Sequence, residues 1–354
     1  MKQKCLFFIL FVLSLYTKPW AQNILTTPSN MPREGDSIIR KQVTYFEAGE
    51  SGENVIWDLR DIQPEDMCHS FWFCRDSDST YLKGMESRLV RKYLCRNDSL
   101  LLSGYETALQ SMYYETPLTI NAFPFAYGNH FIQPFHGLGT YCKKQLLEQH
   151  GTMDVEADAS GTIYLNDADT LYNVLRLHYI TTSSISQHHP GDSVSAEEEN
   201  RKQRIEEHYL WFAHGYRYPI FETSTITIYH DLTPVSCQQT AYCTMPSDQM
   251  ILEDSINRQI LINDSLDRAN AVPIIHYSVS VAGNTISIAY TLDADATINA
   301  IVCDHMGMVY RRATTTDSSG ATGILRLDGN GLKSGIYVLY LNVNGQIYNE
   351  KVEL

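Results

Sequence analysis

Acidic residues gather on both sides of a short apolar segment, GTIYL, near the middle of the chain. They are Asp154, Glu156, Asp158, Asp167 and Asp169. Carboxylates at two-residue spacing lie on one side of a strand, where their oxygens can hold calcium. A pair about 5–10 Å apart would instead suit glycoside hydrolysis. The spacing matches no calcium-binding loop, so we expect no metal and no other cofactor, with calcium at Asp154, Asp158, Asp167 and Asp169 as the alternative.

Aromatic residues and histidines form a second candidate site in the stretch FPFAYGNHFIQPFH. The candidate ligand-binding residues are Tyr127, His130, Phe131 and His136. Planar rings on a loop can stack on a sugar face or bind a protein partner. Rings beside prolines also commonly pack into the end of a β structure, and both interpretations stay open.

The sequence holds none of the short motifs that mark common catalytic sites. There is no HExxH helix, no Gly-x-Ser-x-Gly turn, no phosphate-binding glycine loop and no dinucleotide fingerprint. Five other histidines fit solvated loops and strand positions better than a metal site: His178, His188, His189, His208 and His214. We therefore assign no catalytic residue and expect a protein that is not an enzyme. A secreted hydrolase of carbohydrate or peptide, with its carboxylates scattered among strands, is the alternative.

Residues 1–21 have the layout of a secretory signal peptide. Lys2 and Lys4 precede the apolar run CLFFILFVLSLY, and the small residue Ala21 precedes Gln22, where we expect cleavage. This run is shorter than the roughly 20 residues that a membrane helix needs, and we expect no transmembrane segment elsewhere.

The charge of the chain argues against nucleic acid as a partner. The net charge is −14, and residues 1–21 hold three lysines and no acid, so their removal lowers it to −17. A surface this acidic repels phosphate backbones.

Alternation of apolar and polar residues predicts an all-β domain over residues 22–245. In LYNVLRLHYI, for example, one face is expected to hold Leu171, Asn173, Leu175, Leu177 and Tyr179, and glycines lie beside such runs where turns are needed. We expect a multi-stranded antiparallel domain that is sandwich-like. Residues 246–272 show less alternation and are expected to form a linker with a short helix.

Residues 273–354 have the cleanest strand pattern in the chain. Ile286, Ile288, Tyr290 and Leu292 alternate with smaller or polar residues. About six or seven short strands with turn signals between them predict an Ig-like β-sandwich.

The same stretch carries an ordered set of residues that extends to the end of the chain. They are Gly307, Leu332, Gly335, Tyr337, Gly345, Lys351 and Val352. The pair Asn344-Gly345 is itself a strong hairpin signal. In this order the pattern resembles the carboxy-terminal sorting domain of type IX secretion substrates. The resemblance implies delivery across the outer membrane by the type IX secretion machinery, followed by removal of the domain and surface attachment or release.

Together these features predict an exported, non-enzymatic β protein at the cell surface or in the medium. It would act through binding, adhesion or envelope structure, and the sequence does not indicate whether its ligand is a surface glycan or a protein. A periplasmic structural protein is the further alternative.

Overall fold

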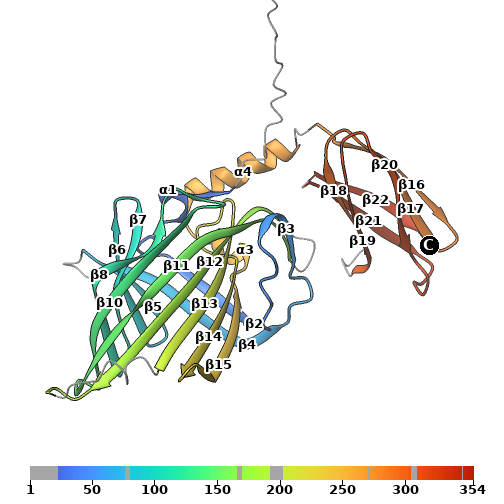
Figure 1. Cartoon of the computed structure of the whole chain (residues 1–354). Helices are drawn as coiled ribbons and strands as arrows, with labels where there is room; N and C mark the ends of the chain where they lie inside the picture. Colours follow the sequence, from blue (N-terminus) through green and yellow to red (C-terminus); the bar gives the residue numbers. More distant parts are fainter. Residues whose placement is uncertain are drawn as a thin grey trace, which may run out of the picture.

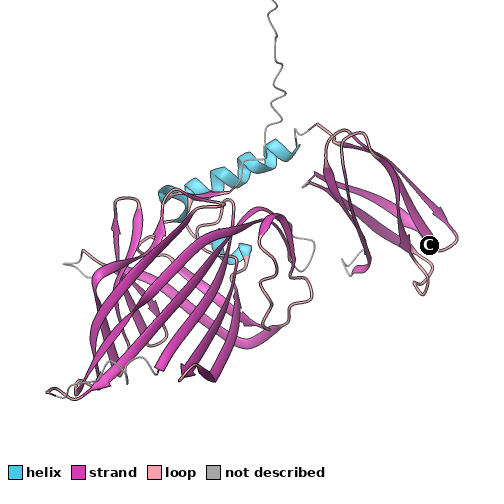
Figure 2. Cartoon of the chain, in the orientation of Figure 1, coloured by secondary structure: helices cyan, strands magenta, loops and turns pink. Residues whose placement is uncertain are grey.

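The computed structural model describes residues 23–75, 80–165, 170–191, 202–269, 272–303, 309–344 and 346–354. They form two β-rich units joined through a helix (Figure 1). The predicted all-β class is confirmed, because strands dominate both units (Figure 2). None of the helices in these ranges is long and apolar enough to cross a membrane.

One large sheet builds the first unit. The strands of its ring are β2 (Ser37–Val43), β4 (Pro64–Arg75), β5 (Leu82–Glu86), β6 (Leu89–Arg96), β7 (Ser99–Glu106), β8 (Gln110–Ala122), β10 (His130–Tyr141), β11 (Gln145–Tyr164), β12 (Thr170–His188), β13 (Lys202–Ala213), β14 (Phe221–His230) and β15 (Thr233–Cys243). They are hydrogen-bonded in the order β10-β8-β7-β6-β5-β4-β2-β15-β14-β13-β12-β11. The ring closes because β10 also pairs with β11, from His130 opposite Glu156 to Tyr141 opposite Gln145. The result is a barrel-like closed sheet (Figure 1).

The expected sandwich-like arrangement of residues 22–245 is corrected by this topology. A sandwich has two sheets that face each other, whereas these strands belong to one sheet that closes on itself. All inward side chains therefore share one interior, which we call the lumen. On β12, Leu175, Leu177 and Tyr179 pack in the lumen, while His178 between them bonds to Glu207 on the outer face.

The N-terminal segment closes one end of the lumen. β1 (Ile24–Leu25) pairs with β9 (Phe125–Ala126), and the short helix α1 (Thr27–Asn30) follows. Arg217 fixes this segment, because it donates to the backbone oxygens of Pro28 and Met31 at 2.8 and 2.7 Å.

Residues 246–272, expected to be a linker, contain two helices that pack on the closed sheet. These are α3 (Pro246–Met250) and α4 (Ser255–Ala269). The buried Asp254 between them accepts a hydrogen bond from Arg217 at 2.7 Å, and His214 Nδ1 lies 2.8 Å from Asp264 Oδ2 in α4. Residues 246–269 therefore pack against the first unit.

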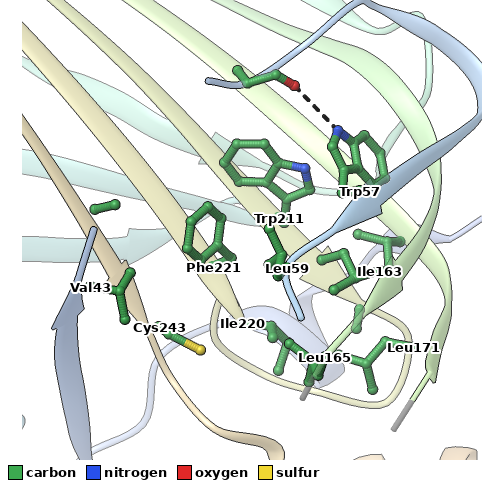
Figure 3. Packing of buried hydrophobic residues seen from close by; sticks show 14 of the residues in the cluster. Val43, Trp57, Leu59, Ile163, Leu165, Leu171, Trp211, Ile220, Phe221 and Cys243 are labelled. Atoms are coloured by element: carbon green, nitrogen blue, oxygen red, sulfur yellow. Dashed lines mark hydrogen bonds between the residues drawn. The ribbon is translucent and has the colours of Figure 1, made fainter. Parts of the chain in front are cut away.

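A further strand, β3 (Gly52–Asp58), covers part of the outer face of the ring and pairs in parallel with the second half of β11. Beneath it, Trp57 packs edge-on against Trp211 of β13, with ring centroids 6.0 Å apart (Figure 3). The Trp57 indole donates to Ala48 O at 3.3 Å, which ties β3 to the loop before it.

Arg176 fastens this loop to the ring. Its side chain is 1% exposed and donates to both oxygens of Asp158, at 2.9 and 2.6 Å. The same guanidinium donates to the backbone carbonyls of Ala48, Gly49 and Glu50. One buried cation thus joins β12, β11 and the loop.

Two smaller sheets build the second unit. Their strands are β16 (Ile275–Ala282), β17 (Thr285–Leu292), β18 (Ala296–Cys303), β19 (Val309–Asp317), β20 (Thr322–Asp328), β21 (Ile336–Val343) and β22 (Gln346–Glu353). The orders are β16-β17-β20 and β19-β18-β21-β22, and in the described part of the chain these strands pair only with one another. Ile288 of the first sheet shares a core with Val302 and Leu339 of the second.

Polar contacts join the two units. Arg312 Nη1 of β19 lies 2.6 Å from Asp58 Oδ2 at the end of β3, and Asn342 Nδ2 lies 3.4 Å from the Tyr164 hydroxyl. Burial raises the pKa of Asp58, but hydrogen bonds from Arg60 and the charge of Arg312 outweigh it and hold that pKa below its ordinary value.

Replacing Arg176 by methionine should destabilise the closed sheet by about 3–5 kcal/mol, because Asp158 would be left buried without its cation. Denaturant unfolding followed by circular dichroism measures this loss. Arg88→Met, at an exposed turn between β5 and β6, is the control and should change stability by less than about 0.5 kcal/mol. Equal stability of the two variants would contradict the role of Arg176.

Candidate functional site

The lumen contains a cavity of about 540 Å³. Sites that hold small organic ligands measure about 300–1,000 Å³. Strands from all around the ring contribute to its wall, and Asn30 and Pro32 of the N-terminal segment line it as well. The cavity is therefore a product of the closed sheet and the segment that covers its end.

Aromatic rings form much of the wall. Phe73 stacks on Tyr218 with centroids 5.7 Å apart, and Tyr114 meets Phe135 edge-on at 5.7 Å. Gly137 makes room for Tyr114, because a Cβ at this position would lie 2.9 Å from the Tyr114 ring. This part of the lumen suits an apolar ligand body.

Charged side chains face the cavity where the ring is joined most weakly. β2 pairs with β15 only through residues 41–43. Beside this seam, Arg40 donates to Glu222 at 2.5 Å and to Glu86 at 2.6 Å, and its guanidinium lies 4.5 Å from the Tyr242 ring centroid. Burial lowers the pKa of Arg40, but the charges of Glu222 and Glu86 outweigh it and leave the pKa above its ordinary value. Arg40 thus stays charged and joins β2 to β14 and β5.

A second charged group lies on β13. Glu206 and His208 line the cavity, with Glu206 Oε2 3.7 Å from His208 Nε2, and Arg204 Nε lies 2.9 Å from Glu206 Oε1. Burial raises the pKa of Glu206, but the interactions with His208 and Arg204 beside it outweigh burial and bring that pKa below its ordinary value. Glu206 is therefore ionised at neutral pH.

Tyr114 and Arg91 lie on the opposite wall of the cavity. Burial raises the pKa of Tyr114, and the charges of Glu206, Arg204 and Arg91 also act on it. Arg91 lines the cavity with its side chain one-third exposed, and Nη1 lies 3.5 Å from Glu86 Oε2.

Gln149 carries a polar atom that the protein leaves without a partner. The residue is 5% exposed and lines the cavity. Its Nε2 donates to Ser183 Oγ at 3.3 Å, but Oε1 has no hydrogen-bond partner among the residues that the structure describes. A buried acceptor without a donor costs about 1–3 kcal/mol, so this position favours an occupant that can donate a hydrogen bond.

Arginine side chains lie beside the three glutamates that line the cavity. Glu86 and Glu222 are both engaged by Arg40, and Glu206 is ionised with Arg204 beside it. A general acid needs a carboxyl group that keeps its proton near neutral pH. Glu206, whose pKa lies below its ordinary value, is not in such a setting.

The predicted ligand-binding residues do not meet in this cavity. Phe131 and Tyr127 pack against the buried apolar cluster inside the ring. His130 and His136 lie on the outer face of β10, where His130 Nε2 is 2.6 Å from Asp154 Oδ1. The structure therefore separates the two aromatic residues from the two histidines.

Two of the acidic residues that flank GTIYL have protein partners. Asp154 pairs with His130, and Asp158 is buried against Arg176. Within the described ranges, no group of three or more His, Cys, Asp or Glu side chains lies together as a metal site would require.

Three of the terminal motif residues pack in the core of the second unit. Tyr337 and Val352 are buried there, and Leu332 packs against the same cluster. Gly335 exchanges backbone hydrogen bonds with the last residue of the chain, and Lys351 is exposed. The motif thus combines packing residues with one exposed charge.

Six of the predicted positions lie outside the described residues. They are Ala21, Gln22, Asp167, Asp169, Gly307 and Gly345.

Sequence reasoning assigned no role to Arg40, Arg91, Glu206 or Gln149, and it treated His208 as an ordinary strand or loop histidine. The available signal was charge at inward positions of apolar strands. In HYLWFA, for example, His208 shares its side of β13 with the lumen residues Leu210 and Phe212.

No family model matches the chain, and no curated protein matches it. Among solved structures, the chain is similar to dimeric latent PorU from Porphyromonas gingivalis, with 9% identity and a TM-score of 0.21. The match covers 90% of this chain and 30% of that chain, so this chain spans about a third of its length or less. A likeness at this level carries no argument about function.

His136 should titrate above the ordinary histidine range. Hydrogen bonds with Glu115 at 3.0 Å and Glu148 at 2.7 Å raise its pKa. The stabilisation is complete below the unfolded pKa of about 6.5 and is lost as the pH rises through the higher folded pKa. NMR titration of the imidazole should show this pKa fall in Glu115→Gln and in Glu148→Gln. Glu156→Gln, on the same outer face, should leave it unchanged, and a titration insensitive to all three changes would contradict the assignment.

Proposed function

We propose that the closed sheet is a binding module that holds a small ligand with an apolar body and a polar end in its lumen. The observation that carries the proposal is the unpartnered Oε1 of the buried Gln149 in a cavity of about 540 Å³. Aromatic walls supply apolar contact area, and the charged groups on β2, β6 and β13 supply polar contacts on one side.

Binding is favoured over the alternative of a secreted hydrolase. The lumen carboxylates are engaged by arginines, and Glu206 has its pKa below the ordinary value. These ion pairs favour a role for the lumen carboxylates in holding the strands together and in neutralising the arginines.

Filling the cavity should weaken ligand binding. Thr181 lines the lumen, whereas its neighbour Ile180 alternates to the outer face of β12. In a titration with the fluorescent apolar probe 1-N-phenylnaphthylamine, Thr181→Trp should weaken binding by about tenfold or more, and Ile180→Trp should bind as the parent does. Circular dichroism confirms that both variants are folded. Absence of probe binding to the parent, or equal binding by both variants, would refute the binding proposal.

We further propose that the second unit is an Ig-like sorting domain and that the protein is exported to the cell surface or the medium by the type IX secretion machinery. Self-contained pairing of β16 to β22 supports this, because such a unit can present a folded surface to a receptor. The ordered terminal motif supports it as well. Periplasmic residence is the alternative.

Deletion of residues 273–354 should retain the protein inside a host that has the type IX machinery. Fusion of residues 273–354 to a neutral periplasmic carrier should export that carrier, which controls for misfolding of the truncated chain. Cell fractionation with immunoblotting measures both. The sorting proposal fails if the truncated chain still reaches the outside or if the fused carrier stays in the periplasm.

A further inference from the structure

Some charged side chains in the lumen have their hydrogen-bond partners within the protein, and others keep donors that are not used. Arg40 makes short hydrogen bonds to Glu86 and Glu222, so these two carboxylates already accept from its guanidinium. Arg91 lies 3.5 Å from Glu86, which is an ion-pair distance without a hydrogen bond between the two groups. The guanidinium of Arg91 therefore faces the cavity with donors to spare.

Arg204 has a donor of the same kind. Its Nε lies 2.9 Å from Glu206 Oε1, but the atoms are not aligned for a hydrogen bond, and this buried Nε has no other partner among the described residues. Arg91 and Arg204 come from opposite walls, and the charges of both act on Tyr114. Arg91 and Tyr114 line the cavity, and Arg204 lies two residues before the lining residue Glu206, on the same side of β13.

Guanidinium donors in this setting match an anionic group that accepts two or more hydrogen bonds. A carboxylate fits better than a phosphate, because Glu86, Glu206 and Glu222 surround the region and would repel a second negative charge. The aromatic wall that includes Phe73, Tyr218 and Phe135 accepts an apolar chain.

We propose that the lumen ligand is an amphipathic carboxylic acid, with its carboxylate at Arg91 and Arg204, its apolar part among the aromatic residues, and a hydroxyl or amide donor on that apolar part for Gln149 Oε1. This inference rests on the proposed binding function and adds the ligand class to it.

A matched pair of competitors tests the class. Dodecanoic acid and 1-dodecanol share an apolar chain and differ in the head group. Each displaces 1-N-phenylnaphthylamine from the purified protein, and the concentration for half displacement is measured. The acid should bind about tenfold or more tightly than the alcohol, since a hydrogen bond to a charged group is worth about 1.5–3 kcal/mol.

Two variants locate the head group. Arg91→Gln and Arg204→Gln should each weaken dodecanoic acid by about tenfold and leave 1-dodecanol within about twofold. Arg88→Gln, at the exposed turn between β5 and β6, is the matched control and should change neither. The second lumen variant keeps the test decisive if the first does not fold.

The outcomes separate the two proposals. Equal affinity of the parent for acid and alcohol overturns the carboxylate assignment and leaves the binding module intact. Tighter binding of dodecyl phosphate than of dodecanoic acid also overturns it, in favour of a phosphate ligand. If neither the probe nor any competitor binds, the binding module itself is refuted.

Discussion

The pairing of β10 with β11 is the contact on which the rest of the first unit depends. β11 has a neighbour on each side: β12 along nearly its whole length, and β10 and then β3 on the other side. This arrangement removes the two free edges that an open sheet would present. It also commits every inward side chain to one interior, since side chains alternate between the two faces of each strand. At the level of Tyr114 and Arg91 the side chains do not fill that interior, and the cavity is what remains.

The interior is polar on one side because charges there occur in neutralising groups. Arg40 with Glu86 and Glu222, and Arg204 with Glu206, keep each ion next to an opposite charge. Burial of an unpaired ion would cost more free energy than the packing around it provides. The same pairing holds outside the ring, where Arg176 and Asp158 fix the loop ahead of β3. Arginine side chains therefore stabilise the fold through ion pairs, and Arg91 also keeps hydrogen-bond donors that could contact a ligand.

Strand content could be predicted from the sequence, but ring closure could not. Alternation at Leu175, Leu177 and Tyr179 is the same in a sandwich as in a closed sheet, because both have one dry face. Asn173, in a left-handed backbone conformation with φ of 52°, adds a local irregularity, so Leu171 packs outside the ring and Leu175 inside. The site was harder still, since Arg91 and Glu206 are far apart in the sequence and line the same cavity only because the sheet closes. Residues 246–272 were ambiguous because Ile256 and Ile260 suit either a helix or a strand.

The seam between β2 and β15 gives the ring a weakest joint. Three backbone pairs and the Arg40 side chain hold it, whereas most other neighbouring strands share much longer ladders. Local opening of a fold begins where the fewest interactions must break together. Thermal fluctuation would thus separate β2 from β15 before other neighbouring strands. This seam lies on the side of the lumen that also bears the charged groups. A molecule leaving the interior could pass between two strands without disturbing the helices that cover the far end.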